Sequence, residues 1–449
     1  MKWTDAEVRA ALGLGVGNAD VQYSGVVTDT RAVGLDSLFV ALKGERFDGH
    51  AFLAAAREAG ATGAVVRRGT APVAGLAFYE VEDTLLAYGW LARFRRRRLP
   101  GPVVAVTGSN GKTATKEMLA AVLATRYRVH ATRINLNNLV GVPQTILECP
   151  DDTEALVVEA GASIPGEIAR YREIIEPSVA IITNVAPSHL DGFGSAAGVM
   201  AEKLELVRGV AVAFVGVDDP ALAAGARMVA RRVVTAGLAD ADVMPQQVTL
   251  EPTGRPRVTV AGVSFVVAQL GLHQAKNAML VWAVAETLGL APLQVAQALE
   301  SFTLPAGRGE VAQYDRLTIL NDSYNANPAS FRALIDVVST LRLGRRLIFV
   351  AGTMRELGAG SAEFHLAIAG ELARLDPDVM VAVGEFGPAF ERHRAQFGER
   401  LIVGEDPVAI ASTVAGRLRG DELVVLKGSR GVRLERMISE LVGQTAKSN

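Results

Sequence analysis

Short apolar runs bounded by turn residues alternate along this chain with longer stretches of helical pattern. A run that is apolar throughout predicts a strand buried on both faces, and its alternation with helices is typical of a parallel sheet covered by helices on both sides. Two series of such runs occur, at residues 103–106, 155–158 and 179–182 and at residues 317–320, 347–350, 379–383 and 423–426. The pattern therefore predicts two large α/β units.

A smaller α/β unit is predicted before them. Residues 37–42 and 64–66 have the pattern of strands, and residues 51–59 that of a helix ended by Gly60. The unit closes with four arginines at 95–98 and a Pro-Gly-Pro boundary at 100–102. The arginines could form a nucleic-acid patch. Because their flanks are not basic, the solvated last turn of a helix is favoured, where cations suit the helix dipole.

Composition narrows the class of protein. The chain has 449 residues, of which 49% are hydrophobic, and its net charge is −2; it is long enough for two to four packed domains and lacks the basic footprint of a nucleic-acid binder. The single cysteine, Cys149, excludes an internal disulfide. No apolar run reaches the ~18–20 residues that cross a bilayer, and residues 1–7 do not resemble a signal peptide. We expect a soluble, cytoplasmic enzyme without nucleic-acid or membrane partners.

A glycine-rich turn between the strand at 103–106 and the helix at 113–125 has the context of a phosphate-binding loop. Such a loop directs backbone amides at an anion, while a lysine neutralises phosphate oxygens and a Ser or Thr hydroxyl can bind Mg²⁺. The usual loop has a glycine where this chain has Val106, so the loop is shortened, and an ordinary strand–turn–helix is the alternative. The predicted loop consists of Thr107, Gly108, Ser109, Asn110, Gly111, Lys112 and Thr113.

Two potential metal ligands follow neighbouring predicted strands. Glu159 comes directly after the strand at 155–158, and His189 lies beyond the strand at 179–182. Ligands of such sheets bind beyond the carboxyl ends of the strands. A carboxylate and an imidazole there could hold a divalent cation, although each alone has an ordinary structural explanation.

Two further features are less specific. Lys203 lies on a predicted helix between Glu202 and Glu205, which favours a surface ion pair. Residues 322–328 are rich in polar groups after the strand at 317–320 and end in the helix-initiating pair Asn327-Pro328. A capped turn explains that pair but not the whole run.

Taken together, these motifs resemble the Mur ligases, ATP-dependent enzymes that form amide bonds in bacterial cell-wall synthesis. The similarity covers essentially the whole chain, and it is greatest to the member that joins D-alanyl-D-alanine to UDP-N-acetylmuramoyl-tripeptide through an acyl phosphate. The motifs that carry it are the shortened phosphate loop and residues 38–50, 135–138 with 141–143, 189–195, 324–328 and 427–430.

The resemblance implies three domains: a small N-terminal α/β domain for the UDP-sugar at 1–100, a central ATP-binding domain with a P-loop-type parallel sheet at 101–305, and a C-terminal Rossmann-like domain at 306–449.

The resemblance also implies roles for individual residues. Lys112 and the loop would hold ATP, as would Asn277, Arg308 and Asp322. Two Mg²⁺ ions would use Thr113, Glu159, His189 and a carbamylated Lys203. Substrate contacts would come from Thr28, Asp29, Thr30, Arg31, Lys43, Phe47, Asp48, His50, Asn135, Asn138, Asn327, Lys427 and Arg430. A monomer is expected.

The chain departs from the family pattern at two places. Thr353 stands where a carboxylate is usual, so no role is assigned to it, and Gln274 follows His273 where an asparagine is usual. A sister ligase that adds the third amino acid, a folate polyglutamate ligase and a regulatory nucleotide switch stay as alternatives. The third residue of the tripeptide, meso-diaminopimelate or L-lysine, stays open.

Overall fold

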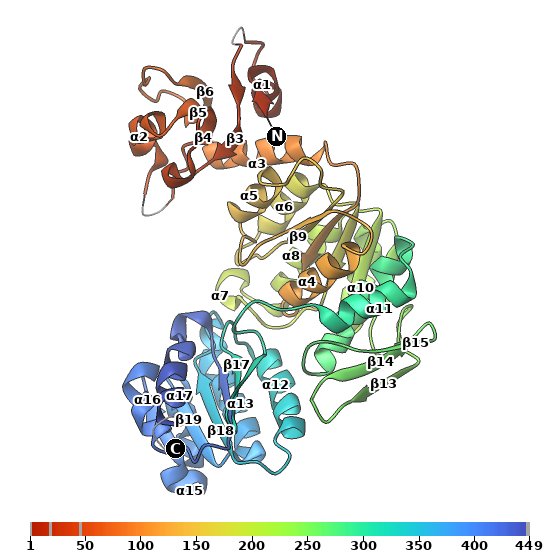
Figure 1. Cartoon of the computed structure of the whole chain (residues 1–449), viewed down its shortest axis with the longest axis vertical. Helices are drawn as coiled ribbons and strands as arrows, with labels where there is room; N and C mark the ends of the chain where they lie inside the picture. The colour runs from red at the N-terminus through yellow and green to blue at the C-terminus, as the bar shows by residue number, and fades with distance from the viewer. Residues whose placement is uncertain (1, 18–19, 45–46, 446–449) are drawn as a thin grey trace.

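The computed structural model of the chain describes residues 2–17, 20–44 and 47–445. Three groups of helices and strands follow one another along the long axis, with the N-terminal and C-terminal groups at opposite ends (Figure 1). Parallel sheets with helices on both faces make up this architecture, as predicted. Met1, of the N-terminal stretch 1–7, and Glu45 and Arg46, of the motif at 38–50, lie outside the described residues.

A four-stranded parallel sheet of order β3-β4-β5-β6 organises the N-terminal group. Asp48 starts a 3-10 turn by accepting a hydrogen bond from the His50 amide (3.0 Å), so the predicted helix at 51–59 is split into η2 and α2. The elements are β1 (Trp3–Thr4), α1 (Asp5–Leu12), β2 (Gln22–Tyr23), β3 (Gly25–Val27), η1 (Thr30–Ala32), β4 (Ser37–Val40), η2 (Gly49–Phe52), α2 (Leu53–Glu58), β5 (Ala61–Arg67), β6 (Ala77–Val81) and α3 (Thr84–Arg96).

The central group is built on a six-stranded parallel sheet of order β12-β11-β10-β7-β9-β8. One apolar cluster packs α4, α10 and α11 on one face, and a second packs α5, α6, α8 and α9 on the other. The elements are β7 (Val103–Thr107), α4 (Lys112–Leu123), β8 (Val129–Ala131), α5 (Gly141–Leu147), β9 (Ala155–Glu159), α6 (Glu167–Ile175), β10 (Val179–Ile182), α7 (Leu190–Phe193), α8 (Ala196–Leu204), β11 (Val212–Gly216), α9 (Pro220–Val229), β12 (Val233–Ala236), α10 (Leu272–Thr287) and α11 (Pro292–Ser301).

A three-stranded antiparallel sheet, β13 (Gln247–Leu250), β14 (Pro256–Val260) and β15 (Val263–Val266), is appended to this group and was not predicted. Its strands are short and partly exposed, so they lack the continuous apolar signal of the buried strands. Val258 and Phe265 nevertheless join the core under α10, and Phe265 stacks on Trp282.

The arginine run ends α3 as predicted, but only Arg97 and Arg98 are exposed to solvent in the way that was expected. The buried Arg95 side chain donates to the Cys149 carbonyl (2.9 Å), and Arg96 donates to the last carbonyls of α6 (2.6 Å). Arg97 pairs with the Glu176 carboxylate (2.7 Å). Carbonyls at a helix C-terminus lack partners within the helix and carry its negative dipole end. The run therefore joins the N-terminal group to the central one.

The C-terminal group has a six-stranded sheet of order β16-β17-β21-β18-β19-β20, in which only the edge strand β16 is antiparallel. Helices α12, α13 and α14 cover one face, and α16 and α17 cover the other. The elements are β16 (Glu310–Tyr314), β17 (Leu317–Asp322), α12 (Pro328–Leu341), β18 (Leu347–Gly352), α13 (Ser361–Leu375), β19 (Val379–Val383), α14 (Phe386–Phe390), α15 (Arg394–Phe397), β20 (Leu401–Gly404), α16 (Pro407–Ala415), β21 (Leu423–Lys427) and α17 (Ile438–Thr445).

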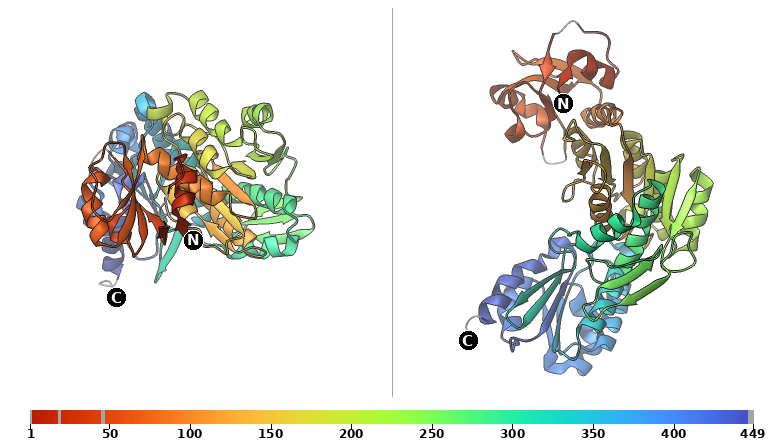
Figure 2. Two further views of the ribbon diagram at one scale, coloured as in Figure 1. Left: turned by 90° about the horizontal axis from the view of Figure 1, so that it is seen from above. Right: turned by 45° about the vertical axis from the view of Figure 1, so that its right-hand side comes forward.

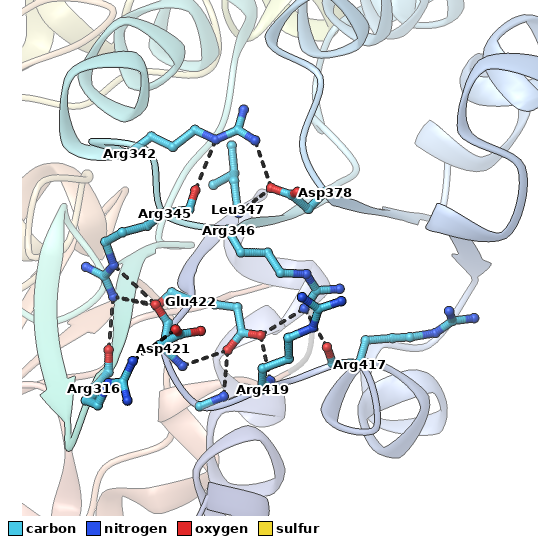
Figure 3. A network of polar contacts seen from close by, with 11 residues as sticks. Arg316, Arg342, Arg345, Arg346, Leu347, Asp378, Arg417, Arg419, Asp421 and Glu422 are labelled. Atoms are coloured by element: carbon cyan, nitrogen blue, oxygen red, sulfur yellow. Dashed lines mark hydrogen bonds and ion pairs between the residues drawn. The ribbon is translucent and has the colours of Figure 1, made fainter.

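The amino ends of these parallel strands are tied together by a polar network around Glu422, which precedes β21 (Figure 3). The Glu422 side chain is completely buried and accepts hydrogen bonds from Arg346 (2.8 Å) and from the backbone amides of Arg419 (2.6 Å) and Gly420 (2.9 Å). A buried carboxylate is tolerated only where such donors compensate its lost hydration.

We expect Glu422→Ala to lower the free energy of unfolding by about 3 kcal/mol, because it leaves a partly buried guanidinium and several amides without their acceptor. Urea denaturation followed by circular dichroism measures the loss. Glu399→Ala, at an exposed position, is the control and should change the midpoint little. Equal midpoints for the two variants would contradict a stabilising role of the network.

Candidate active site

The carboxyl ends of three adjacent strands bring the predicted site residues to one edge of the central sheet. Because β7 lies between β10 and β9, the loop after β7 is flanked by Glu159 at the end of β9 and by residues 184–189 after β10. The Asn184 side chain ties the last of these segments to the loop, since it accepts from the Asn110 amide and donates to the Asn110 carbonyl (3.0 Å each).

Two glycines are required by the shape of the loop. Gly108 has a φ of +147°, and a Cβ there would lie 1.9 Å from Thr183 Oγ1. Gly111 has a φ of +78°, and its Cβ would lie 2.7 Å from Asn277 Oδ1. L side chains rarely adopt such φ values, so the loop needs glycine for both conformation and space. Asn277, on α10, thereby packs directly behind the loop.

The Lys112 amine lies against the loop itself. Its Nζ donates to the carbonyls of Gly108 (2.8 Å) and Ser109 (3.3 Å). Burial lowers the pKa of Lys112, and the nearby Glu159 carboxylate opposes that shift. The amine is therefore positioned at the mouth of the loop, where an anionic ligand would compete for it with the two carbonyls.

The two carboxylate oxygens of Glu159 differ in their hydrogen bonding. Asn137 Nδ2 donates to Oε1 (2.8 Å), while Oε2 is buried and has no hydrogen-bond partner among the described residues. An unpartnered buried carboxylate oxygen is costly unless a ligand satisfies it, so a cation fits there. Thr113 is buried at the start of α4, and His189 is about a quarter exposed. Within the described parts of the chain, no three His, Cys, Asp or Glu side chains cluster closely enough to hold a metal unaided.

Lys203 contradicts the surface ion pair that its sequence neighbours favour. Its side chain is 1% exposed, with Nζ 5.7 Å from the centroid of the Phe193 ring. Glu202 instead accepts from the amides of Gly166 (2.8 Å) and Ile168 (2.7 Å), and Glu205 pairs with an arginine. Burial and the positive charge of Lys112 lower the pKa of Lys203 to about 7. The amine is thus kept in a site that disfavours its charge.

The C-terminal group supplies the opposite wall of the site. Lys427 Nζ, buried at the end of β21, pairs with Asp322 Oδ2 (2.6 Å) at the end of β17. The Arg308 guanidinium stacks on the Tyr324 ring, 3.9 Å from its centroid. Asn327 begins α12 as its N-cap, as predicted, and its Nδ2 also donates to Asn110 Oδ1 in the phosphate loop (2.8 Å).

A cavity of about 750 Å³ lies between the central and C-terminal groups. The predicted site residues that line it are Ser109, Asn110, Gly111, Lys112, Thr113, Asn135, Asn138, Glu159, His189, Arg308, Asp322 and Lys427. Asn137 and Asn184 also line it, within the segments 135–138 and 184–189 that the sequence places at the site. Lining residues to which the sequence assigned no role include Ser163, Lys276, Tyr324 and Asn325. Of these, Tyr324 and Asn325 belong to the polar run at 322–328, which was the signal for them.

Asn138, which lines the cavity, also accepts a hydrogen bond through Oδ1 from the Gly141 amide at the first residue of α5 (2.8 Å). Arg430 and the N-terminal residues are not among the described lining residues. Arg430 is exposed, and its guanidinium carbon lies 5.7 Å from the centroid of the Tyr324 ring. The N-terminal set, Thr28, Asp29, Thr30, Arg31, Lys43, Phe47, Asp48 and His50, belongs to the group at the far end of the molecule and does not contribute to the described cavity lining (Figure 2).

Within that N-terminal set, charged side chains are held in fixed pairs. Asp29 caps η1 and accepts from Arg31 Nη2 (2.6 Å), which lowers the pKa of Asp29 to about 2. Asp48 contacts His50 Nδ1 (2.6 Å), and Phe47 is 59% exposed. The set therefore contains an exposed aromatic ring and two pairs of polar side chains that contact each other.

The two departures from the family pattern have local partners. Thr353 Oγ1 accepts from the Glu385 amide (3.0 Å), a role that a carboxylate could also fill. Gln274 Oε1 accepts from Asn277 Nδ2 (3.1 Å), which orients the amide behind the loop.

Comparison with known proteins places these features in a family. Family models match three consecutive segments: the Mur ligase family catalytic domain at residues 22–96, the Mur ligase middle domain at 106–285 and the Mur ligase glutamate ligase domain at 307–430. In sequence, the chain is 35% identical to UDP-N-acetylmuramoyl-tripeptide--D-alanyl-D-alanine ligase of Bacillus subtilis, with 93% of both chains covered. It is 34% identical to the enzyme of the same name from Escherichia coli, with 94% of both covered.

Solved structures with the same three-domain fold superpose on nearly the whole chain. Crystal structure I of MurF from Acinetobacter baumannii superposes with a TM-score of 0.89 at 30% identity, covering 99% of each chain. MurF ligase from Thermotoga maritima in complex with ADP gives a TM-score of 0.84 at 29% identity, covering 95% of this chain and 98% of that one.

Proposed function

Because this chain belongs to the Mur ligase family, we propose that it is the ligase that joins D-alanyl-D-alanine to UDP-N-acetylmuramoyl-tripeptide. The products are UDP-N-acetylmuramoyl-pentapeptide, ADP and phosphate, so the enzyme acts in peptidoglycan precursor synthesis. The observation that carries this function is a shared cavity in which a phosphate loop faces the Lys427–Asp322 pair of another domain.

ATP is the energy source of the reaction, in keeping with the ADP complex of the Thermotoga relative. We place its phosphates on the loop amides and Lys112. Asn277, behind the loop, and Arg308 and Asp322, across the cavity, would hold the rest of the nucleotide. We also propose domain divisions near residues 100 and 305, with the C-terminal domain closing over the central one.

Mg²⁺ fits the same edge of the sheet. The buried, unpartnered Glu159 oxygen and the Thr113 hydroxyl would hold one ion with the ATP phosphates, and His189 would hold a second. When bound, Mg²⁺ neutralises charge on the phosphoryl group in transfer.

A carbamate on Lys203 would supply the oxygen ligand that the second ion otherwise lacks. An ammonium cannot bind a cation, whereas a carbamate is an anionic oxygen donor. The side chain is buried, and among the described residues no carboxylate forms an ion pair with its amine. Burial of an uncompensated charge is unfavourable, so the site favours the neutral amine that reacts with carbon dioxide.

A carboxylate does not acylate an amine at neutral pH, because oxide is a poor leaving group. ATP therefore has to activate the carboxylate first. Transfer of the γ-phosphoryl group converts the terminal carboxylate of the tripeptide into an acyl phosphate. The amine of D-alanyl-D-alanine then attacks the acyl carbon, and the tetrahedral intermediate expels phosphate. Lys112 would stabilise negative charge during the transfer. Closure of the C-terminal domain would exclude the water that hydrolyses an acyl phosphate.

The remaining site residues are assigned to the two acceptors. The N-terminal set with Phe47 would carry the UDP-sugar, and Asn135, Asn138, Asn327, Lys427 and Arg430 would surround the dipeptide. We propose a monomer in the cytoplasm, where ATP and UDP-linked precursors occur. In the described parts of the chain, none of the helices has the length and apolar content needed to span a bilayer.

The acceptor should be required as a dipeptide. With UDP-N-acetylmuramoyl-tripeptide, we expect D-alanyl-D-alanine to release phosphate and single amino acids to release at least ~10²-fold less, because a site that binds both ends leaves polar groups without partners when only one end is present. A phosphate-release assay over donors and acceptors measures this.

The same assay separates the alternatives. Use of the UDP-muramoyl-dipeptide with a free diamino acid would identify the sister ligase that adds the third residue. ATP turnover that no acceptor stimulates would contradict a ligase and favour a nucleotide switch. Comparison of donors ending in meso-diaminopimelate and L-lysine identifies the natural tripeptide.

A further inference from the structure

One contact joins the C-terminal domain to a proposed metal ligand. The carboxylate of Glu356, in the loop after β18, pairs with Nδ1 of His189, just before α7. Beside it, the Leu190 amide donates to the Glu356 carbonyl (2.9 Å). Figure 1 shows α7 at the boundary between the central and C-terminal groups. Glu356 therefore reaches the site from a different domain than the residue it contacts.

The backbone on both sides of this contact is held in an unusual conformation. Glu356 has a φ of +64° and His189 a φ of +52°, values that non-glycine residues seldom adopt. Such conformations persist only where the surroundings enforce them, and they concentrate at functional sites. Gly358 packs close by, with the position of its absent Cβ 3.4 Å from Asp191 Oδ1. The two loops are thus shaped to meet.

The C-terminal domain fixes the loop that carries Glu356. The Arg355 amide donates to Ser429 Oγ (2.9 Å), and the Met354 amide donates to Nε2 of the buried His365 (2.9 Å). The backbone that carries Glu356 is therefore held by its own domain.

The contact determines which nitrogen of His189 is available. Both side-chain contacts of His189 among the described residues, to Glu356 and more weakly to Ser163 Oγ (3.4 Å), use Nδ1. A metal-binding histidine commonly donates its other ring N–H to a carboxylate, which fixes the tautomer and ring orientation and makes the ligating nitrogen more basic. With Nδ1–H donated to Glu356, Nε2 is the nitrogen left to bind a cation.

We propose that Glu356 is a positioning residue that orients His189 for the metal ion, supplied by the C-terminal domain across the domain boundary. This inference rests on the proposed function, because it takes His189 as a metal ligand. Its consequence is that the affinity of the site for the cation depends on domain closure: the carboxylate is in place only when the two loops meet.

The test is the binding of Mn²⁺ alone to the full chain, in bicarbonate buffer without nucleotide, followed by electron paramagnetic resonance of the free ion. Glu356→Gln should raise the dissociation constant by about 10–100-fold, the usual effect of losing such a carboxylate. The thermal unfolding midpoint should stay that of wild type. Glu356→Gly, which suits the positive φ and removes the carboxylate, should give the same loss. In turnover assays, the apparent KM for Mg²⁺ should rise more than kcat falls.

Two further variants make the result decisive. Glu363→Gln removes an exposed carboxylate from the same domain and should bind Mn²⁺ like wild type. His189→Ala should lose the ion. If His189→Ala loses Mn²⁺ while both Glu356 variants bind within about twofold of wild type, the positioning role is wrong and the proposed function stands. If His189→Ala itself binds like wild type, His189 is not a ligand, and both this inference and the metal assignment of the proposed function are overturned.

Discussion

Lys112→Ala is expected to lower ligation turnover by on the order of 10²–10³-fold or more, the loss found when a preorganised electrostatic group is removed from a transition state. The amine is partly buried at the mouth of the loop, where its charge is screened less than it would be in open water. In the structure it donates to the Gly108 and Ser109 carbonyls, so ATP phosphates would replace acceptors already at hydrogen-bond distance. Phosphate release with all substrates present measures the effect.

Lys112→Arg is the matched variant, since it keeps the charge but changes the shape of the donor. We expect it to recover part of the activity if charge is the main contribution. Circular dichroism and the thermal unfolding midpoint report whether each variant is folded. Near-normal turnover of a folded Lys112→Ala protein would remove the phosphate-loop assignment.

Lys203→Ala is expected to reduce turnover by about 10²-fold or more, because it removes the anionic oxygen that a carbamate would contribute. A small carboxylate such as formate or acetate should restore part of the activity by occupying the space left by the side chain. Wild type should lose activity when bicarbonate and carbon dioxide are removed and regain it when they return. Mass spectrometry of the native protein gives a second measure, the mass of an added carboxyl group.

Glu205→Gln is the control for this experiment. Glu205 is the neighbour that the sequence pattern suggested as a partner for Lys203, but the structure pairs it with Arg208 on the surface. Its loss should change turnover little, as for other exposed ion pairs. Equal activity of Lys203→Ala and wild type would instead make Lys203 a residue of the folded core without a part in catalysis.

The phosphate loop illustrates what local sequence specifies. A buried strand, a glycine turn and a helix start are set by neighbouring residues, and the positive φ values at Gly108 and Gly111 are the reason glycine stands there. Glu159 and His189 could be placed for a related reason: parallel strands end at one edge, so residues after neighbouring strands converge. The sequence could not tell that Asn137 would hold one Glu159 oxygen, because that depends on how two loops meet.

Charged side chains were the least predictable part of the molecule. The same pattern of lysine beside glutamate fits a surface helix and the buried Lys203, and only the packing of α8 against neighbouring helices decides between them. Likewise, nothing in the sequence around the arginines that end α3 predicts their hydrogen bonds to the last carbonyls of α6.

By itself, then, the sequence determined the alternation of buried strands with helices, the three-part organisation, the phosphate loop and the family, because these depend on periodicity and on contiguous motifs. Tertiary structure alone decided the burial of Lys203, the hydrogen bonds between the end of α3 and the end of α6, and the contact between Glu356 and His189. Each of these depends on contacts between residues far apart in the chain. Burial and long-range pairing set the energy of a charged group, and no local pattern encodes them.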